Sequence, residues 1–430
     1  MRVLVVGAYG LIGGYVAARL LAAGHEVVGA GRDLDAAARR FPRVRWVRAD
    51  LAKMSTEAWA APLDGVEAVV NCAGALQDGP RDNLEGVHAR GLERLLVACA
   101  QAGVKRFVHI SAASVEKDRP TVFNTTKWQG EGVVAAGGVA WVILRPGLVL
   151  APAAYGGTAL LRGMAALPLV LPVVFAKSDI QIVSIDDVVE AVARALAPGA
   201  PVGVRVDLVH RDSVTLGALV LRLRGWLGLK PAPVIALPPI FARIPAVISD
   251  ALAWLGWRSP MRTSALEQLR LGVRGDAGAA KRVLGLEPKS LDQILAAWPS
   301  GVQERWFAKL YFVKPALLIG LALFWILSGV IGLTTGWDGA VAALHGAGAG
   351  DKAADLALAG AVVDIALGGL LAFRRTARAA LLCMLWVSGA YLIGASLFTP
   401  GLWSDPLGSV LKIVPIMLAT CAALAILDER

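Results

Sequence analysis

The sequence contains few cysteines, and none of them lies at a spacing that would hold a metal ion. The four are scattered through the chain, with no C-x-x-C pair and no zinc-type pattern: Cys72, Cys99, Cys383 and Cys421. We therefore expect reduced thiols that pack against their neighbours, and no metal site.

Charged residues are also scarce, at 18% of the chain, and they form no dense basic run with aromatic residues between. A nucleic-acid-binding protein would need such a patch, so we expect no nucleic-acid partner. The net charge of +10 is better explained by an anionic cofactor and by the inner leaflet of a membrane. Hydrophobic residues make up 56% of the chain, which predicts a membrane part.

What the chain does contain begins with a nucleotide-binding pattern at its N-terminus. An apolar run leads into three glycines at G-x-x-G-x-x-G spacing. In a dinucleotide-binding βαβ unit these permit a tight turn, close approach of the pyrophosphate, and packing of the next helix, whose N-terminus favours the anion. Because the motif starts at Met1, we expect no signal peptide and a cytosolic location for this end. The predicted contacts are Gly7, Tyr9, Gly10, Leu11, Ile12 and Gly13.

Residues 1 to about 150 alternate apolar strand-like runs with helical patterns. This alternation predicts an α/β fold of the Rossmann type, with a doubly wound parallel sheet. The predicted strands are 3–6, 26–30, 44–47, 68–71, 106–110 and 140–145, and the predicted helices include 12–23 and 92–102.

Residues 151–305 are less regular, and we interpret them as a substrate-side subdomain and linker that completes a nucleotide-binding domain over 1–305. The apolar stretch 158–175 contains Arg162 and two prolines and precedes a predicted strand at 179–185. We interpret this stretch as part of the subdomain, with a segment in the membrane interface as the alternative.

Four long apolar runs follow, at 315–333, 356–373, 379–398 and 410–427. Each has about the ~20 residues needed to cross ~30 Å of hydrocarbon. The sequence therefore predicts an all-α domain of four transmembrane helices over 306–430, in contact with the lipid bilayer.

The loop charges predict the orientation of these helices. Arg and Lys precede the first run and follow the second, where Arg374, Arg375 and Arg378 lie close together. The loop 335–352 has a single Lys at its end, and 399–406 has neither Lys nor Arg. By the positive-inside rule, both termini are cytoplasmic in a multi-pass protein of the inner membrane.

Two ionisable residues, Asp364 and Lys412, lie within the apolar runs. A charge inside the bilayer is costly unless it is paired or hydrated. We hypothesise that both face the interior of the bundle and pair or line a polar pocket. A purely structural pair is the alternative, and Lys412 is close enough to the end of its run to reach the interface.

The N-terminal motifs resemble those of the extended and atypical short-chain dehydrogenase/reductases, which include NAD-dependent epimerase/dehydratase-like proteins and an accessory subunit of respiratory complex I. The resemblance covers residues 1 to about 300. It implies that Asp50 and Leu51 lie beside the adenine, that Ala73 and Gly74 lie against the adenine ribose, and that Pro146 passes the nicotinamide.

Arg32 follows the second predicted strand, at a place where an acidic residue would bind the ribose 2′-hydroxyl of NAD. An Arg there suits the 2′-phosphate of NADP through a charge-assisted fork. We therefore favour NADP(H) over NAD(H), although the neighbouring Asp33 leaves NAD(H) as an alternative.

The resemblance also implies a catalytic Ser and a Y-x-x-x-K pair, in which Tyr is the general acid and Lys lowers its pKa. Ser111 matches the Ser, with Ser114 as a competitor, and Lys127 matches the Lys. Phe123 occupies the Tyr position, and no Tyr lies between Tyr15 and Tyr155. A phenyl ring cannot transfer a proton, so the usual carbonyl reduction is in doubt. We interpret Tyr155 and His109 as packed side chains rather than as substitutes.

Residues from about 306 resemble the DoxX-like four-helix membrane family. The resemblance lies in Lys314-Pro315, in Ser328-Gly329, in Asp364, and in Lys412 followed by Pro415. Two functions fit the whole chain. The first is a membrane-anchored NAD(P)H-binding oxidoreductase for an apolar substrate such as a quinone or lipid. The second is an NADPH-binding structural, assembly or sensor protein without turnover.

Overall fold

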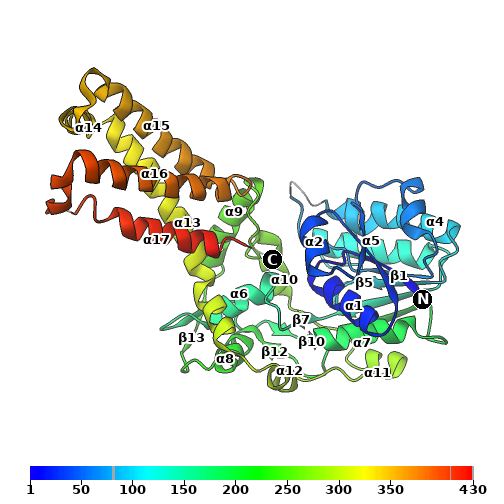
Figure 1. Cartoon of the computed structure of the whole chain (residues 1–430). Coiled ribbons are helices and arrows are strands. Elements are labelled where there is room, and N and C mark those ends of the chain that lie inside the picture. The colour runs from blue at the N-terminus through cyan, green and yellow to red at the C-terminus, as the bar shows by residue number, and fades with distance from the viewer. Residues whose placement is uncertain (80–82, 407, 429–430) are drawn as a thin grey trace. The chain divides into compact units, whose positions relative to one another are not determined.

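The computed structural model describes residues 1–79, 83–406 and 408–428. They divide into two compact units (Figure 1). The first comprises Met1–Asp250 with Pro260–Ala308, and the second comprises Ala251–Ser259 with Lys309–Arg430. The second unit thus takes in a short segment from the middle of the chain, which the sequence had placed in the linker.

The first unit is built on a parallel sheet of seven strands in the order β11-β6-β5-β4-β1-β2-β3. This order confirms the predicted Rossmann-type fold. Six of the strands match the predicted ones, whereas β11 was not predicted. The strands are β1 (Arg2–Val6), β2 (Glu26–Gly31), β3 (Arg45–Arg48), β4 (Ala68–Asn71), β5 (Arg106–Ile110), β6 (Trp141–Pro146) and β11 (Val204–Leu208).

Both faces of this sheet are buried, because successive side chains along β1 enter different cores. Val3 and Val5 belong to the core that also takes in α1 (Leu11–Ala22) and α7 (Ile185–Leu196). Leu4 and Val6 belong to the core that takes in α4 (Gly91–Gln101) and Val134 of α5 (Val122–Ala136). Because all seven strands are parallel, their carboxyl ends lie at one edge of the sheet, and the predicted site residues follow these ends.

Residues 148–300 add a third core beside the sheet. The apolar stretch 158–175 lies in α6 (Gly156–Ala165) and β8 (Leu171–Val174), and its Leu161 and Leu171 are buried there, as expected for a subdomain. The predicted strand 179–185 is instead two short strands followed directly by α7. The remaining elements are α8 (Leu216–Trp226), α10 (Thr263–Leu271), α11 (Ala279–Leu284), α12 (Leu291–Ala297), β7 (Leu148–Leu150), β9 (Asp179–Ile180), β10 (Ile182–Ser184), β12 (Val214–Thr215) and β13 (Val234–Leu237).

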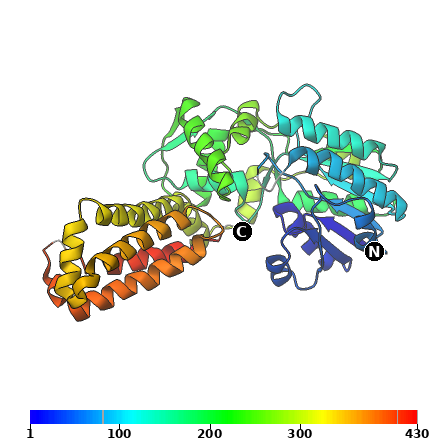
Figure 2. The same ribbon diagram turned by 90° about the horizontal axis from the view of Figure 1, so that it is seen from above.

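The second unit is a helical bundle (Figure 2, yellow to red). Among the described residues, three helical segments are long and apolar enough to cross a membrane: Val302–Leu333, Trp337–Leu371 and Ala377–Phe398. The fourth predicted span, 410–427, is helical only over α17 (Ile413–Ala425), which rises about 20 Å and falls short of a hydrocarbon core. The other helices of the bundle are α13 (Val302–Leu333), α14 (Trp337–Leu344), α15 (Ala353–Leu371) and α16 (Ala377–Phe398).

The segment 251–259 is held to the bundle by the turn between α15 and α16. The Trp257 indole N–H donates to the carbonyl oxygen of Ala372 at 2.7 Å, and the Arg374 N–H donates to that of Leu255 at 3.0 Å. The Arg374 guanidinium lies 5.7 Å from the centroid of the Trp257 ring. The segment begins in the last turn of α9 (Ile240–Trp254), a helix with many exposed apolar side chains.

Candidate functional site

The glycine loop forms the turn that a dinucleotide site requires. Gly7 has φ +78°, a conformation that favours glycine, and its N–H donates to the Ala30 carbonyl oxygen of β2 at 2.9 Å. The Gly10 N–H then donates to the Gly7 carbonyl oxygen at 2.9 Å, and α1 begins at Leu11. The loop therefore ends with the N-terminus of α1 directly after the edge of the sheet.

Gly13 allows α1 to pack closely on this loop. A Cβ at this position would lie 2.2 Å from the Gly7 carbonyl oxygen. In the described structure no side chain caps α1 at Gly10, and its first turn contains no acidic residue. The backbone N–H groups of that turn are therefore available to an anion such as a pyrophosphate.

Tyr9 lies over the end of β2. A Cβ on Gly31 would come within 2.1 Å of the Tyr9 ring, so only glycine leaves room for it. The Tyr9 hydroxyl accepts a hydrogen bond from the Arg32 N–H at 3.3 Å, and the Arg48 guanidinium donates to the Arg32 carbonyl oxygen at 3.1 Å. Two guanidinium-bearing residues thus lie beside an aromatic ring where the ribose of a bound nucleotide would be expected.

Asp50 and Leu51 follow β3 with different surroundings. The Asp50 Oδ1 accepts a hydrogen bond from the Ala52 N–H at 3.2 Å, and Oδ2 lies 4.0 Å from the Lys53 Nζ. Leu51 is buried in the core beneath α4. Asp50 thus shapes the turn and keeps a partly exposed carboxylate, whereas Leu51 contributes packing.

The end of β4 brings Ala73 and Gly74 to the glycine loop. A Cβ on Gly7 would lie 3.0 Å from the Ala73 backbone nitrogen, so the two segments are in close contact. The Asn71 Oδ1 accepts a hydrogen bond from the Ala73 N–H at 3.1 Å and orients this turn. A Cβ on Gly74 would lie 3.5 Å from the Lys127 Nζ, so α5 joins the site at the same place.

Lys127 is buried, and its Nζ donates to the Ile110 carbonyl oxygen at 3.0 Å. Burial lowers the pKa of this amine to about 8, although Glu131 and Cys72 act in the opposite direction. The Lys127 Nζ therefore lies between the segments that follow β4 and end β5.

Phe123 lies one turn before Lys127 and packs on a histidine that the sequence did not indicate. Its ring meets that of His88 edge-on, with centroids 5.8 Å apart. The His88 Nε2 accepts from the Ala75 N–H at 3.2 Å, which leaves Nδ1 to donate to the Thr126 hydroxyl oxygen at 2.9 Å. Burial lowers the pKa of His88 to about 2, so this imidazole stays neutral and does not replace a tyrosine acid.

His109 is a buried core histidine, as the sequence indicated. Its Nδ1 lies 3.1 Å from the Asn71 Nδ2, which donates to it, and burial holds the pKa of the ring well below its usual range. Neither histidine is therefore a proton donor at neutral pH.

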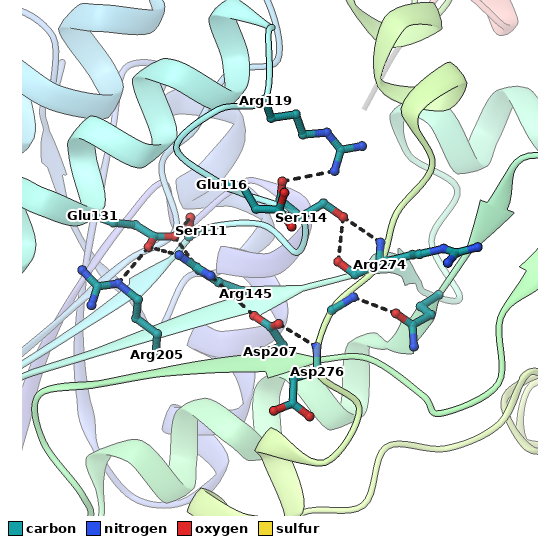
Figure 3. A network of polar contacts seen from close by, with 12 residues as sticks. Ser111, Ser114, Glu116, Arg119, Glu131, Arg145, Arg205, Asp207, Arg274 and Asp276 are labelled. Carbon is teal, nitrogen blue, oxygen red and sulfur yellow. Dashed lines mark hydrogen bonds and ion pairs between the residues drawn. The ribbon is translucent and has the colours of Figure 1, made fainter.

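Both expected serines are engaged by neighbouring groups. The Ser111 hydroxyl donates to the Glu131 Oε1 at 2.6 Å, and the Ser114 hydroxyl donates to the Arg274 carbonyl oxygen at 2.7 Å. Figure 3 shows Arg145 and Arg205 converging on the same Glu131, with distances of 2.8 Å from the Arg145 Nε and 3.1 Å from the Arg205 Nε. Glu131 is 1% exposed. Ser111 therefore belongs to a buried ionic cluster that anchors β5, β6 and β11 to α5.

Pro146, the last of the predicted cofactor contacts, is buried, and Tyr155, which the sequence indicated as a packed side chain, is half-buried. Pro146 ends β6, and its carbonyl oxygen accepts a hydrogen bond from the Ala113 N–H at 2.8 Å. Tyr155 precedes α6, where its carbonyl oxygen accepts from the Thr158 hydroxyl at 2.8 Å. The arrangement can hold a dinucleotide, but no tyrosine occupies the proton-donor position beside Lys127.

Each half of the chain matches a known family model. Residues 7–164 match an NAD(P)H-binding family model, and residues 322–421 match that of a DoxX-like family. An uncharacterized protein of Mycobacterium tuberculosis is 27% identical over 295 residues, which cover 66% of this chain and 32% of that protein. The chain therefore spans about a third of the length of that relative.

Two further proteins are similar to the nucleotide-binding half. The mitochondrial NADH-ubiquinone oxidoreductase 40 kDa subunit of Neurospora crassa is 32% identical over 152 residues, which cover 33% of this chain and 39% of the subunit. The structure of UDP-glucuronic acid 4-epimerase from Bacillus cereus, in complex with UDP-glucuronic acid and NAD, superposes with a TM-score of 0.53 at 19% identity. It covers 72% of this chain and 100% of the epimerase. The chain thus combines an NAD(P)-binding Rossmann domain, with the fold of the short-chain dehydrogenases and sugar-nucleotide epimerases, and a C-terminal DoxX-like domain of apolar helices.

Proposed function

We propose that this protein is a membrane-anchored NAD(P)H-dependent oxidoreductase that passes hydride to an apolar, membrane-soluble acceptor such as a quinone or lipid. The observation that carries the proposal is a complete dinucleotide loop joined, in one chain, to DoxX-like membrane helices. The name of the fungal relative, a subunit of an NADH-ubiquinone oxidoreductase, supports the choice of acceptor class.

Different residues of the site bind different parts of the nucleotide. The loop and the N-terminus of α1 hold the pyrophosphate, Ala73 and Gly74 leave room for the ribose, and the Lys127 ammonium binds its hydroxyls. A bound nicotinamide supplies the hydride. Because Phe123 cannot donate a proton, the acceptor must take its proton from water or from a group outside this cluster. Quinones meet this condition more easily than simple ketones.

The test uses the full-length protein, purified gently in detergent. Bound nucleotide is identified by mass, and the absorbance of reduced nicotinamide is followed after addition of a short-chain quinone. Catalytic oxidation of NADPH is expected. Stoichiometric NADPH that stays reduced with every acceptor would refute the reductase, and failure to bind any nucleotide would refute the site itself.

A second function is favoured by a specific observation, the packing of Phe123 on His88 together with the engagement of Ser111 by Glu131. In this alternative the protein binds NADPH as a structural or sensing ligand, and serves as a membrane scaffold or assembly subunit. Turnover of bound NADPH by a quinone separates the two. The Phe123→Tyr variant restores the missing hydroxyl and tests how the proton arrives. A variant that reduces carbonyl compounds would show that the rest of the site is competent for hydride transfer.

We further propose a preference for NADP(H), supported by Arg32, which follows β2, and by Arg48, the last residue of β3. Arg32→Ala should weaken binding of NADPH about tenfold while NADH affinity stays within about twofold, because a charge-assisted contact contributes roughly 1.5–3 kcal/mol. Arg39→Ala, an exposed change on α2 (Asp35–Arg40), is the matched control. Equal losses for both nucleotides would contradict the assignment.

The same proposal places the chain in the inner membrane, with a nucleotide domain at 1–305 and a membrane domain at 306–430. Arg374, Arg375 and Arg378 follow α15, which supports a cytoplasmic N-terminus. The Lys314 Nζ, before the apolar part of α13, donates to the Leu427 carbonyl oxygen at 3.0 Å, which supports the same side for the C-terminal end. Labelling of single cysteines with a membrane-impermeant reagent in intact cells tests this. A label at position 401 and none at position 375 is expected, and the reverse pattern would overturn the orientation.

A further inference from the structure

The membrane unit contains a cavity of about 180 Å³ that the nucleotide site does not use. It is lined by aromatic and aliphatic side chains, and five of its lining residues carry polar groups. The lining residues are Phe324, Trp325, Ser328, Asp364, Ser388, Tyr391, Ile413 and Ile416. We propose that this cavity binds the ring of a quinone or quinol, held by hydrogen bonds from Trp325 and to Asp364. The proposal rests on the proposed function, because it names the acceptor class.

The lining residues come from one face of each helix. Trp325 and Ser328 are three residues apart on α13, as are Ser388 and Tyr391 on α16. Residues at this spacing are neighbours on a helix surface. Four helices therefore direct their lining faces into one space, with Asp364 contributed by α15.

Close contacts between α13 and α15 keep one wall of this space in place. A Cβ on Gly329 would lie 2.4 Å from the Ala361 carbonyl oxygen, and a Cβ on Gly368 would lie 2.7 Å from that of Ala322. Small residues at such contacts let two helix backbones approach within a membrane. The wall that carries Ser328 and Asp364 is thus formed by backbones in direct contact.

Asp364 is only 7% exposed and serves as the acceptor of the cavity. Its Oδ2 accepts from the Ser328 hydroxyl at 3.0 Å, and its Oδ1 accepts from the Tyr391 hydroxyl at 3.1 Å. The expected pairing with Lys412 is absent from the described residues, and Lys412 is exposed just before α17. Each carboxylate oxygen keeps a lone pair for a further donor.

Trp325 supplies the complementary group. Its side chain is 3% exposed, and within the described part of the chain its buried indole N–H has no hydrogen-bond partner. An unpaired buried donor is rare and calls for an acceptor. A ligand oxygen would satisfy it. A quinone carbonyl offers this acceptor, and a quinol offers in addition an O–H for Asp364.

The side chains that form the walls of the cavity favour the same class of ligand. Phe324 and Trp325 meet edge-on, with ring centroids 6.4 Å apart, and Ile413 and Ile416 complete an apolar surface. Such walls suit a flat ring. An acyl chain would leave both the indole N–H and the carboxylate without a partner, so lipid tails fit this chemistry less well.

Binding of a radiolabelled short-chain ubiquinone analogue, measured without NADPH on the full chain in lipid nanodiscs, tests the proposal. Saturable binding is expected. Trp325→Phe keeps the ring and removes the N–H, so it should weaken binding about fivefold to tenfold. Asp364→Asn should weaken binding of the reduced analogue by a similar factor.

Matched controls lie on the same helices. Trp386→Phe changes an indole on α16 that is 78% exposed, and Asp355→Asn changes an exposed carboxylate on α15. Both should bind like the wild type. If Asp364→Asn does not fold, Trp325→Phe alone still decides. Non-saturable binding, or a Trp325→Phe variant that binds the analogue as tightly as Trp386→Phe does, would refute the proposed quinone site. Neither result would touch the nucleotide site, which NADPH binding and its oxidation by a water-soluble acceptor test separately.

Discussion

Gly13 offers the sharpest test of the nucleotide loop. In Gly13→Ala the new methyl carbon would lie 2.2 Å from the Gly7 carbonyl oxygen and 2.8 Å from its carbon. Non-bonded carbon–oxygen contacts require about 3.3 Å. The start of α1 must therefore retreat from the loop by about 1 Å.

This displacement sets the size of the expected effect. Overpacking of this kind costs roughly 1–3 kcal/mol, and it moves the N–H groups that would bind the pyrophosphate. At 1.4 kcal/mol for each tenfold change, we expect affinity for NADPH to fall about tenfold to a hundredfold.

Titration of nucleotide binding, with thermal melting in the presence and absence of NADPH, measures the effect on purified full-length protein. Gly132→Ala is the matched control, since a Cβ there meets nothing within 4 Å and the residue lies inside α5. That control should bind normally and melt slightly higher, because Ala is favoured over Gly in a helix. A Gly13→Ala variant with wild-type affinity would refute the assignment of the loop.

Three further predictions concern the residues behind the loop. Glu131→Gln leaves two arginines without their carboxylate, so the variant should lose about 3 kcal/mol of stability in chemical unfolding. Glu190→Gln, at a half-buried carboxylate that pairs with exposed arginines, should lose under about 1 kcal/mol; equal effects would contradict the role of the cluster. Lys127 has a pKa of about 8, so its ammonium is lost as the pH rises through 8; the dissociation constant of NADPH should therefore rise between pH 7 and 9 in the wild type and stay flat in Lys127→Met, and a flat wild-type profile would exclude an ionic role. His88 stays neutral because its pKa is about 2. The change in NADPH affinity between pH 5.5 and 7, a range in which the 2′-phosphate of the nucleotide itself titrates, should therefore be the same in the wild type and in His88→Gln; a step present only in the wild type would show that the ring is protonated.

The central sheet could be predicted because strands buried on both faces are written as continuous apolar runs. Residues 3–6 and 68–70 are such runs, and the helical patterns between the strands give the alternation of a doubly wound fold. The strand β11 was missed because it pairs with β6 across a separation of about sixty residues and includes Arg205 and Asp207. No local pattern signals such a pairing.

The site was predictable where backbone shape carries the chemistry and less so where side chains meet from distant segments. The spacing of Gly7 and Gly13 in the sequence was enough to predict that they form the turn and allow α1 to pack on it. By contrast, Ser111 was expected to be the catalytic serine, but its hydroxyl donates to Glu131, which also binds two arginines, one of them 74 residues away from Glu131. His88 gave no sequence signal, because a single histidine in a short helical turn has many ordinary explanations.

The segment 251–259 has a consequence for how the two halves can be separated. The polypeptide passes from one unit to the other three times, after Asp250, after Ser259 and after Ala308. A chimera joined at residue 305 would take Trp257 away from the Ala372 carbonyl that binds it. The two domains therefore cannot be exchanged by a cut at one position. An exchange of membrane domains between related chains must include residues 251–259 together with the helices.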